Sequence, residues 1–318
     1  PDSRTTNFRE FITDTEECST MSTPWVAIQR NPISGAGNRA LLIKDLVLHL
    51  KQKGIRPRLF SNRDRMQELL KQRAAEDQPL CIVAAGGDGT VQDVINRYPD
   101  QCIAILPLGT ENLLARYFGI EKSGQFVAEM ISRGVSREID LCQINDRKFV
   151  LMASIGFDAA VVEALTLSRT GNISHLSYLK PIWKTLCAYP FEPLHITTDG
   201  GEQEMTAYHV IVVNIPAYGL NLNFAPAAND HDGLLDLILL RKKGIWSMIK
   251  YVFRIIRGTH LDSRSVQKLQ AKQIRIQSAH PVPIQTDGDA TGSTPADIRI
   301  IPAAARFIVP CSTPANDQ

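Results

Sequence analysis

Three glycine-containing segments carry the residues best suited to chemistry in this sequence. They are residues 31–38 (NPISGAGN), 86–90 (GGDGT) and 107–116 (PLGTENLLAR). Glycine lets an anion approach the main chain closely, and the hydroxyl and amide side chains beside it can donate hydrogen bonds. The three segments therefore predict sites for phosphate groups.

Any one of these segments is explained most simply as a turn between a strand and a helix. Three of them, each after a predicted strand, favour a ligand site, because ligands of α/β proteins lie where strand ends meet the amides of helix N-termini. Their spacing matches neither GxxxxGK[ST] nor GxGxxG followed by a ribose-binding acid. We therefore expect a phosphate site of another kind.

Asp88 stands among the glycines of the second segment. A carboxylate at this place repels phosphate unless a cation lies between the two. We therefore predict that Asp88 binds Mg²⁺ directly or through water.

The segments lie within a regular alternation of predicted strands and helices. Strand patterns cover residues 25–32, 55–61, 80–87 and 102–109, and helical patterns cover 40–50, 62–76 and 90–98. This alternation is typical of a parallel sheet with crossover helices.

The pattern changes after residues 134–144 (GVSREIDLCQI). Short alternating runs follow at residues 148–158, 191–200, 207–217, 234–243, 272–289 and 298–310, with helical segments around 165–186 and 245–258. This pattern predicts an antiparallel β domain. We expect a polar N-terminal tail at 1–23, an α/β domain at 24–136 with 303–318, and a β domain at 137–302.

Composition limits the classes of protein that this chain can belong to. It has 318 residues, of which 44% are hydrophobic and 21% charged, and a net charge of +2, which is too balanced to indicate nucleic-acid binding. Its six scattered cysteines favour neither structural zinc nor a disulfide framework, so we expect a reducing, cytoplasmic location. No run is long enough for a membrane-spanning helix, and the first residues lack the apolar core of a signal peptide.

An ordered series of motifs resembles the diacylglycerol kinase catalytic domain family, which includes bacterial lipid kinases, sphingosine kinases and ceramide kinases. The series comprises NPISGAGN, GGDGTVQDVIN, LPLGTENLLAR, IDLCQIND, SIGFDAAVV, VVNIPAYGLNLNFAPAANDHDGLLDLILL and IQTDGD. The resemblance implies an ATP-binding α/β domain, a following β-sandwich domain and a chain end that returns to the first domain. It also implies a kinase that uses ATP and Mg²⁺.

The resemblance assigns roles to residues of this chain. The residues implied to bind the nucleotide are Gly86, Gly87, Asp88, Gly89, Thr90, Asn31, Ser34, Gly35, Ser61, Gly109, Thr110 and Asn112. Asp287 corresponds to the family's proposed general base, and the implied catalytic set is Asp287, Asp88 and Asp289. The two domains would bring Asp88 and Asp287 to a shared cleft.

This chain departs from the family pattern at several positions. Asp289 replaces a common glutamate, which shortens that acidic side chain by one methylene, and Glu111 stands where glycine is frequent. The resemblance also implies a secondary cation site formed by Asn229, Asp232 and Leu234. A plain Asp-Gly turn explains that stretch equally well, and TDGD at 286–289 is also a hairpin signal.

The substrate implied by the resemblance is a lipid with a hydroxyl group, and we expect diacylglycerol or a related glycerolipid. Residues 241–258 (RKKGIWSMIKYVFRIIRG) mix basic, aromatic and aliphatic residues, as helices on an anionic membrane surface do. The alternative is an ordinary amphipathic helix packed on the β domain, and residues 178–186 are a weaker membrane candidate. Peripheral contact with the inner membrane surface is thus an expectation, whereas the oligomeric state, a dimer included, stays open.

Two other functions compete with a lipid kinase. NAD kinases share a GGDGT loop and a string like TGST at residues 291–294, but that string lies near the end of the β domain here. A catalytically silent nucleotide- or lipid-binding protein is the second alternative, and Asp289 and Glu111 motivate it.

Overall fold

The computed structural model describes residues 5–7, 23–30, 38–168, 189–199, 204–216 and 224–311. The chain forms two compact units, one of residues 1–139 with 303–318 and one of residues 140–302. We call them unit 1 and unit 2 and treat each by itself.

Unit 1 contains a parallel sheet. Its strand order is β5 (Ile103–Pro107), β4 (Ile82–Gly86), β2 (Trp25–Arg30) and β3 (Arg56–Phe60), and all three pairings are parallel. The C-terminal part of β17 (Ala296–Ile308) pairs in parallel with β5, with Phe307 opposite Ile103. The predicted parallel sheet and the return of the chain to the first domain are both confirmed.

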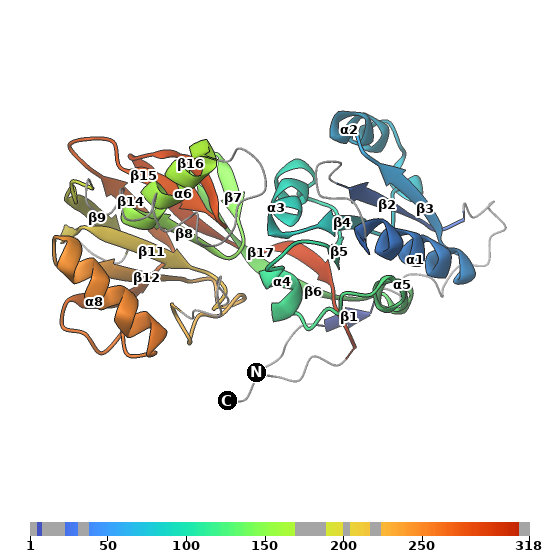
Figure 1. Ribbon diagram of the computed structural model, residues 1–318. Coiled ribbons are helices and arrows are strands. Elements are labelled where there is room, and N and C mark those ends of the chain that lie inside the picture. The colour runs from blue at the N-terminus through green and yellow to red at the C-terminus, as the bar shows by residue number, and fades with distance from the viewer. Residues whose placement is uncertain are drawn as a thin grey trace. The chain divides into compact units, whose positions relative to one another are not determined.

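Helices cover both faces of this sheet, as its apolar strands require. They are α1 (Asn38–Gln52), α2 (Arg63–Lys71), α3 (Asp88–Arg97), α4 (Leu113–Tyr117) and α5 (Gly124–Arg133), with a short 3₁₀ turn at Ala75–Asp77. Helices α1 and α5 pack together on one face, and α2 and α3 lie on the other (Figure 1). Asn62 and Ser123 cap α2 and α5 by accepting hydrogen bonds from the amides of Arg65 and Phe126.

The segment GGDGT differs from the expected loop. Strand β4 ends at Gly86, Gly87 is the N-cap, and α3 begins at Asp88, so Gly89 and Thr90 belong to its first turn. An acid at this position is favourable, because the positive end of the helix dipole stabilises a carboxylate.

Part of the expected N-terminal tail forms a strand. β1 (Thr5–Asn7) pairs antiparallel with β6 (Val135–Ile144), with Thr6 opposite Ser136. The prediction of a plain tail was therefore wrong for these residues. Their polar composition gave no signal, because main-chain hydrogen bonds at a sheet edge do not require apolar side chains.

Unit 2 is a sandwich of antiparallel strands. One sheet has the order β13 (Val266–Ala271), β12 (Leu235–Leu240), β11 (His209–Val213), β8 (Met152–Ile155), β15 (Pro283–Thr286) and β16 (Asp289–Ser293). The other contains β10 (Met205–Ala207), β9 (Leu194–Thr198), β14 (Gln273–Gln277) and the first part of β17, and β6 and β7 (Arg147–Phe149) pair beside them. Side chains of both sheets form one buried core, for example Val212 and Leu237 with Ile196 and Ile276. The predicted β-sandwich is confirmed.

Within its described residues, unit 2 contains two helices. They are α6 (Phe157–Ser168), which packs on β8, β15 and β16, and α8 (Ile245–Ile256). The first begins earlier than the predicted 165–186, and residues 169–188 lie outside the described residues. None of the helices that the structure describes is long and apolar enough to cross a membrane.

Candidate functional site

In unit 1, two of the three glycine segments touch each other through their main chains. A Cβ built on Gly109 would lie 2.6 Å from the Cα atom of Gly87, and one built on Gly86 would lie 2.0 Å from Oγ1 of Thr90. No side chain fits at either position. Gly89 is different: it is exposed, and a Cβ there would meet nothing within 4 Å. Gly87 and Gly109 therefore pack the two loops together, Gly86 packs against Thr90 of its own segment, and Gly89 leaves open space at the first turn of α3.

Asp88 joins the same two loops. Its Oδ2 and Oδ1 atoms accept hydrogen bonds from the amides of Leu113 (3.1 Å) and Leu114 (3.2 Å), the first residues of α4. Asn112, the N-cap of α4, provides no side-chain cap of its own and adopts a left-handed backbone with φ of 49°. Asp88 thus caps α4 from another segment of the chain, a contact that the sequence did not indicate.

The side chain of Asn112 closes its own loop instead. Its Oδ1 accepts from the amide of Gly109 at 2.7 Å, and its Nδ2 donates to the carbonyl of Gly109 at 2.9 Å. Thr110 is exposed and Thr90 is buried. The structure therefore brings together the predicted residues of the second and third segments at the carboxyl ends of β4 and β5.

Of the remaining predicted nucleotide residues, the structure describes only Ser61. Ser61, directly after β3, is exposed, and its Oγ accepts from Nε of Arg30 at 2.9 Å. Asn31, Ser34 and Gly35 lie outside the described residues. Of the chain around the first segment, the structure describes Arg30, which directly precedes it.

Sequence reasoning missed Arg30. It is the last residue of β2, it is exposed, and its guanidinium lies beside the hydroxyl of Ser61, a residue predicted to line the nucleotide site. A cation at the carboxyl end of a strand is well placed to bind an anionic ligand. The available signal was its position directly before NPISGAGN.

In unit 2, Asp287 occupies the turn of the hairpin between β15 and β16. Asp287 and Gly288 both have positive φ, 49° and 86°, as a two-residue hairpin turn of the primed type requires. The Oδ1 atom of Asp287 accepts from the amides of Leu151 (2.9 Å) and Met152 (3.0 Å), and Oδ2 accepts from the amide of Val150 (2.9 Å). Hydrogen bonds from three amides favour the ionised carboxylate and fix its orientation.

A buried polar chain supports this turn from beneath. The amide of Gly288 donates to Oε1 of Gln285 at 2.9 Å, and Nε2 of Gln285 donates to Oγ of Ser154 at 2.9 Å. Ser154 in turn donates to Oδ2 of Asp158 at 2.5 Å. Sequence reasoning assigned no role to these residues. The polar residues at predicted strand positions in SIGFD and IQTDGD were the available signal of a buried hydrogen-bond network.

His209 borders the same chain and is 2% exposed. Its Nε2 lies 3.6 Å from Oδ1 of Asp158, and Gly156, with φ of 133°, packs against its ring. Burial lowers the pKa of His209, and the charge of Asp158 acts in the opposite direction. The imidazole is therefore held in its neutral form below the pH at which an exposed histidine takes up a proton.

Asp289 is not arranged like Asp287. It is exposed at the start of β16, and its Oδ2 lies 3.1 Å from Nη2 of Arg147 on β7. An exposed ion pair contributes little to stability. The pair does place a cation beside the acid that was predicted to act on a metal or a proton.

The predicted secondary cation site is a tight turn in this structure. Oδ1 of Asp232 accepts from the amide of Leu234 at 2.9 Å, and Oδ2 of Asp140 accepts from the amide of Gly233 at 2.7 Å. Partial burial raises the pKa of Asp232, and the nearby Asp236 and Asp140 add to this effect. Asn229 is partly buried in the same loop. The oxygens are of the kind that hard cations prefer, but the turn already uses one oxygen of Asp232.

The donor set also limits how a magnesium ion could be held. Among the residues that the structure describes, no three His, Cys, Asp or Glu side chains converge as metal ligands. Mg²⁺ usually takes one or two carboxylates and completes its coordination with phosphate oxygens and water. Both oxygens of Asp88 accept an amide hydrogen bond, but each keeps a further lone pair, so Asp88 fits such a site as a single carboxylate. A bound polyphosphate and water would supply the other ligands.

Comparisons with known proteins agree with this two-domain architecture. The Diacylglycerol kinase catalytic domain matches residues 26–144. The YegS C-terminal NAD kinase beta sandwich-like domain matches residues 152–309. The class of protein is defined by an α/β domain with glycine loops that is followed by a β-sandwich with an acidic hairpin turn. Residues 26–144 of this chain thus match the diacylglycerol kinase catalytic domain, and residues 152–309 match the β-sandwich-like domain.

Individual relatives are distant. A Mycobacterium tuberculosis protein (strain H37Rv) named diacylglycerol kinase is 26% identical over 300 residues, which cover 88% of this chain and 93% of that protein. The Bacillus subtilis diacylglycerol kinase is 25% identical over 223 residues, 68% of this chain and 73% of its own. A crystal structure of a diacylglycerol kinase from Bacillus anthracis superposes with a TM-score of 0.67 at 21% identity, covering 91% of this chain and 98% of that one. At this identity, the last comparison establishes the fold alone.

The two kinds of glycine predict different effects of the same substitution. We expect Gly109→Ala to lower the free energy of unfolding by about 1–3 kcal/mol, because its Cβ would displace the main chain of Gly87. Gly89→Ala, the matched control, should leave stability unchanged or slightly higher, because alanine is the better helix residue and nothing stands in its way. Denaturant unfolding of both variants measures the difference, and equal losses would contradict the proposed loop contact.

The lowered pKa of His209 predicts a pH dependence of stability. The unfolded chain takes up a proton near the ordinary pKa of 6.5, whereas the folded unit resists it, so the free energy of unfolding should fall as pH drops below that value. The slope contributed by this residue approaches about 1.4 kcal/mol per pH unit. Unfolding of the wild type and of His209→Gln between about pH 7 and pH 5 tests it. A variant with the wild-type slope would show that His209 does not titrate this way.

Proposed function

We propose that this protein transfers the γ-phosphate of ATP to the hydroxyl group of a lipid, and that the lipid is diacylglycerol or a related glycerolipid. The observation that carries the proposal is the match of residues 26–144 to the diacylglycerol kinase catalytic domain, followed by the match of residues 152–309 to the YegS C-terminal domain. Relatives matched along most of their length are named diacylglycerol kinase. We take diacylglycerol as the proposed substrate from the names of these relatives.

The geometry of unit 1 supports the nucleotide side of this reaction. Amides at the N-terminus of α3, the open space over Gly89 and the guanidinium of Arg30 suit a polyphosphate. We assign Asp88 to magnesium, held directly or through water. The ion would neutralise charge on the transferred phosphate, which is its usual role in phosphoryl transfer.

The geometry of unit 2 supports a role for Asp287 at the acceptor hydroxyl. Three amides hold its carboxylate in one orientation, and hydrogen bonds of this kind favour the charged form of a carboxylate. Such a carboxylate is a weak base, but a loose phosphoryl-transfer transition state needs an oriented hydroxyl more than a strong base. We therefore propose that Asp287 orients the hydroxyl and accepts its proton as the new oxygen–phosphorus bond forms and the bond between the γ-phosphorus and the leaving ADP breaks.

Two alternatives keep a specific observation in their favour. The β-sandwich domain that residues 152–309 match is named after NAD kinase as well, so NAD is an acceptor to be tested. The ion pair of Asp289 with Arg147 leaves that acid less suited to bind a metal, as a silent binding protein would allow. Both predict no labelled lipid.

The deciding experiment is transfer of labelled γ-phosphate from magnesium ATP to lipids in mixed micelles. Diacylglycerol, a glycerophospholipid with a free head-group hydroxyl, a sphingoid base and ceramide form the panel, with NAD as a parallel acceptor. We expect label on a glycerolipid. Label on NAD alone would reassign the activity, and binding of ATP without a labelled acceptor would favour the silent protein.

Asp287→Asn tests the role given to Asp287. We expect kcat to fall at least about 100-fold, because the amide can neither take the proton nor keep the charge. Asp297→Asn, which removes an exposed carboxylate paired with Arg275 in the same unit, should stay within about twofold of the wild type. The melting temperature of both variants must be recorded, because an amide can accept fewer of the three main-chain hydrogen bonds. A folded Asp287→Asn protein with normal kcat would refute the assignment.

A further inference from the structure

Helix α8 has three distinct faces. Met248, Tyr251 and Ile255 are 5–7% exposed and pack on the sandwich, which accounts for an ordinary amphipathic helix. Trp246 and Phe253 lie on the opposite side at 73% and 51% exposure. With 3.6 residues per turn, Trp246, Ile249, Phe253 and Ile256 form one stripe along the helix. We call this set the apolar stripe.

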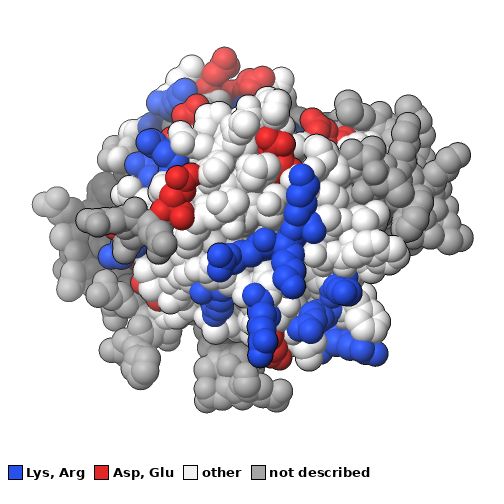
Figure 2. Space-filling model, turned by 90° about the vertical axis from the view of Figure 1, so that its left-hand side faces the viewer, with Lys and Arg blue, Asp and Glu red and all other residues white. Residues whose placement is uncertain are grey.

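The third face is basic. Lys250, Arg254 and Arg257 lie along one side of the apolar stripe, and Arg241, Lys242 and Lys243 precede the helix; all six are exposed. Residues 241–257 contain no Asp or Glu. Figure 2, which faces the side of the molecule that carries α8, shows Lys and Arg side chains gathered in one region with few acids between them. The guanidinium of Arg257 lies 4.0 Å from the ring centroid of Phe253, so the basic and apolar faces adjoin.

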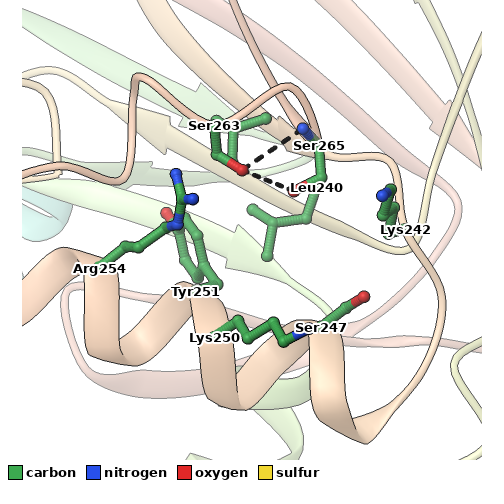
Figure 3. Close-up of a pocket in the computed structure, with 9 residues that line it drawn as sticks. Leu240, Lys242, Ser247, Lys250, Tyr251, Arg254, Ser263 and Ser265 are labelled. Carbon is green, nitrogen blue, oxygen red and sulfur yellow. Dashed lines mark hydrogen bonds between the residues drawn. The ribbon is translucent and has the colours of Figure 1, made fainter.

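A pocket of about 250 Å³ opens beside the basic face. Three cations, Lys242, Lys250 and Arg254, line it together with Ser247, Ser263 and Ser265. The helix supplies Lys250 and Arg254 from below, and the loop with Ser263 and Ser265 forms the opposite wall (Figure 3). Described residues lining the pocket include no acid, so the pocket has the chemistry of a phosphate site.

The start of α8 adds to this positive field. Gly244, its N-cap, provides no side-chain hydrogen bond, and the first turn contains no acid. Uncapped amides at a helix N-terminus attract anions, and the three preceding basic residues would otherwise oppose the helix dipole. An anion here would relieve that unfavourable arrangement.

We propose that α8 is a docking face for an anionic phospholipid surface. The apolar stripe enters the boundary between headgroups and acyl chains, and the pocket beside Lys250 and Arg254 receives the phosphate of one headgroup. The inference goes beyond the proposed activity and does not depend on it, because binding requires no nucleotide.

Charge complementarity selects this occupant. An exposed tryptophan among aliphatic side chains, flanked by cations, matches the composition of interfacial helices, in which each basic residue gains from an anionic leaflet. A second copy of this chain would present the same positive charges to the helix, so like charges would meet. Residues 241–257 offer no acids with which a basic partner could pair.

Partitioning of the full chain between buffer and vesicles tests the proposal. We expect the protein to bind vesicles of phosphatidylcholine mixed with phosphatidylglycerol, to bind pure phosphatidylcholine weakly, and to be released by salt. The emission of Trp246 should shift to the blue on binding. The shift is isolated by subtracting the spectrum of Trp246→Phe, which keeps the other two tryptophans of the chain, Trp25 and Trp183.

Matched variants separate the docking face from net charge. Lys250→Gln with Arg254→Gln should weaken partitioning at least about tenfold. Lys51→Gln with Lys71→Gln removes the same charge from exposed positions on α1 and α2, and it should change partitioning less than about twofold. All four side chains are exposed, so the fold should survive.

Three results would overturn the proposal. They are no binding of the wild type to the anionic vesicles, an equal loss in the control variant, and binding without a shift in the emission of Trp246. A concentration-dependent dimer that Trp246→Ser abolishes, in a protein that ignores vesicles, would assign the face to a second copy instead.

Discussion

The candidate nucleotide site depends on the main-chain contact between Gly87 and Gly109. At this contact no Cβ fits, so the ends of β4 and β5 meet more closely than side chains would allow. Asp88 strengthens the same junction by accepting hydrogen bonds from the first two amides of α4. The loops that face a ligand are therefore held by each other, and Gly89 is left to face open space.

The acid of unit 2 is held by the same principle. Asp287 accepts hydrogen bonds from the three amides of residues 150–152. Hydrogen bonds among Gln285, Ser154 and Asp158 connect its turn to the interior of the unit. Both acids assigned to chemistry thus also stabilise their surroundings. Loss of activity on substituting either one has a chemical and a structural component, which only a stability measurement separates.

The surface of α8 shows how one helix serves two environments. Three of its residues complete the packing of the sandwich, while the opposite face exposes aromatic and aliphatic side chains next to a cluster of cations. Transfer of the exposed side chains of Trp246 and Phe253 from water into the boundary of a lipid bilayer would be favourable, because it buries apolar surface. A helix needed only for packing would gain nothing from this arrangement.

The sequence by itself determined the alternation of strands and helices, the change to a β domain and the series of motifs that carries the family resemblance, which in turn implied the return of the chain end. Those features depend on hydrophobic periodicity and on local motifs, which can be read within a few neighbouring residues. Only the tertiary structure decided that Asp88 caps α4, that Asp289 pairs with Arg147 and that Thr5–Asn7 joins β6. The partners in these contacts lie between 25 and 142 positions apart, and nothing in local spacing indicates which distant amide or cation a side chain will meet. The same reason hid the pocket beside α8, whose basic wall could be read in residues 241–257 but whose serines come from a separate loop.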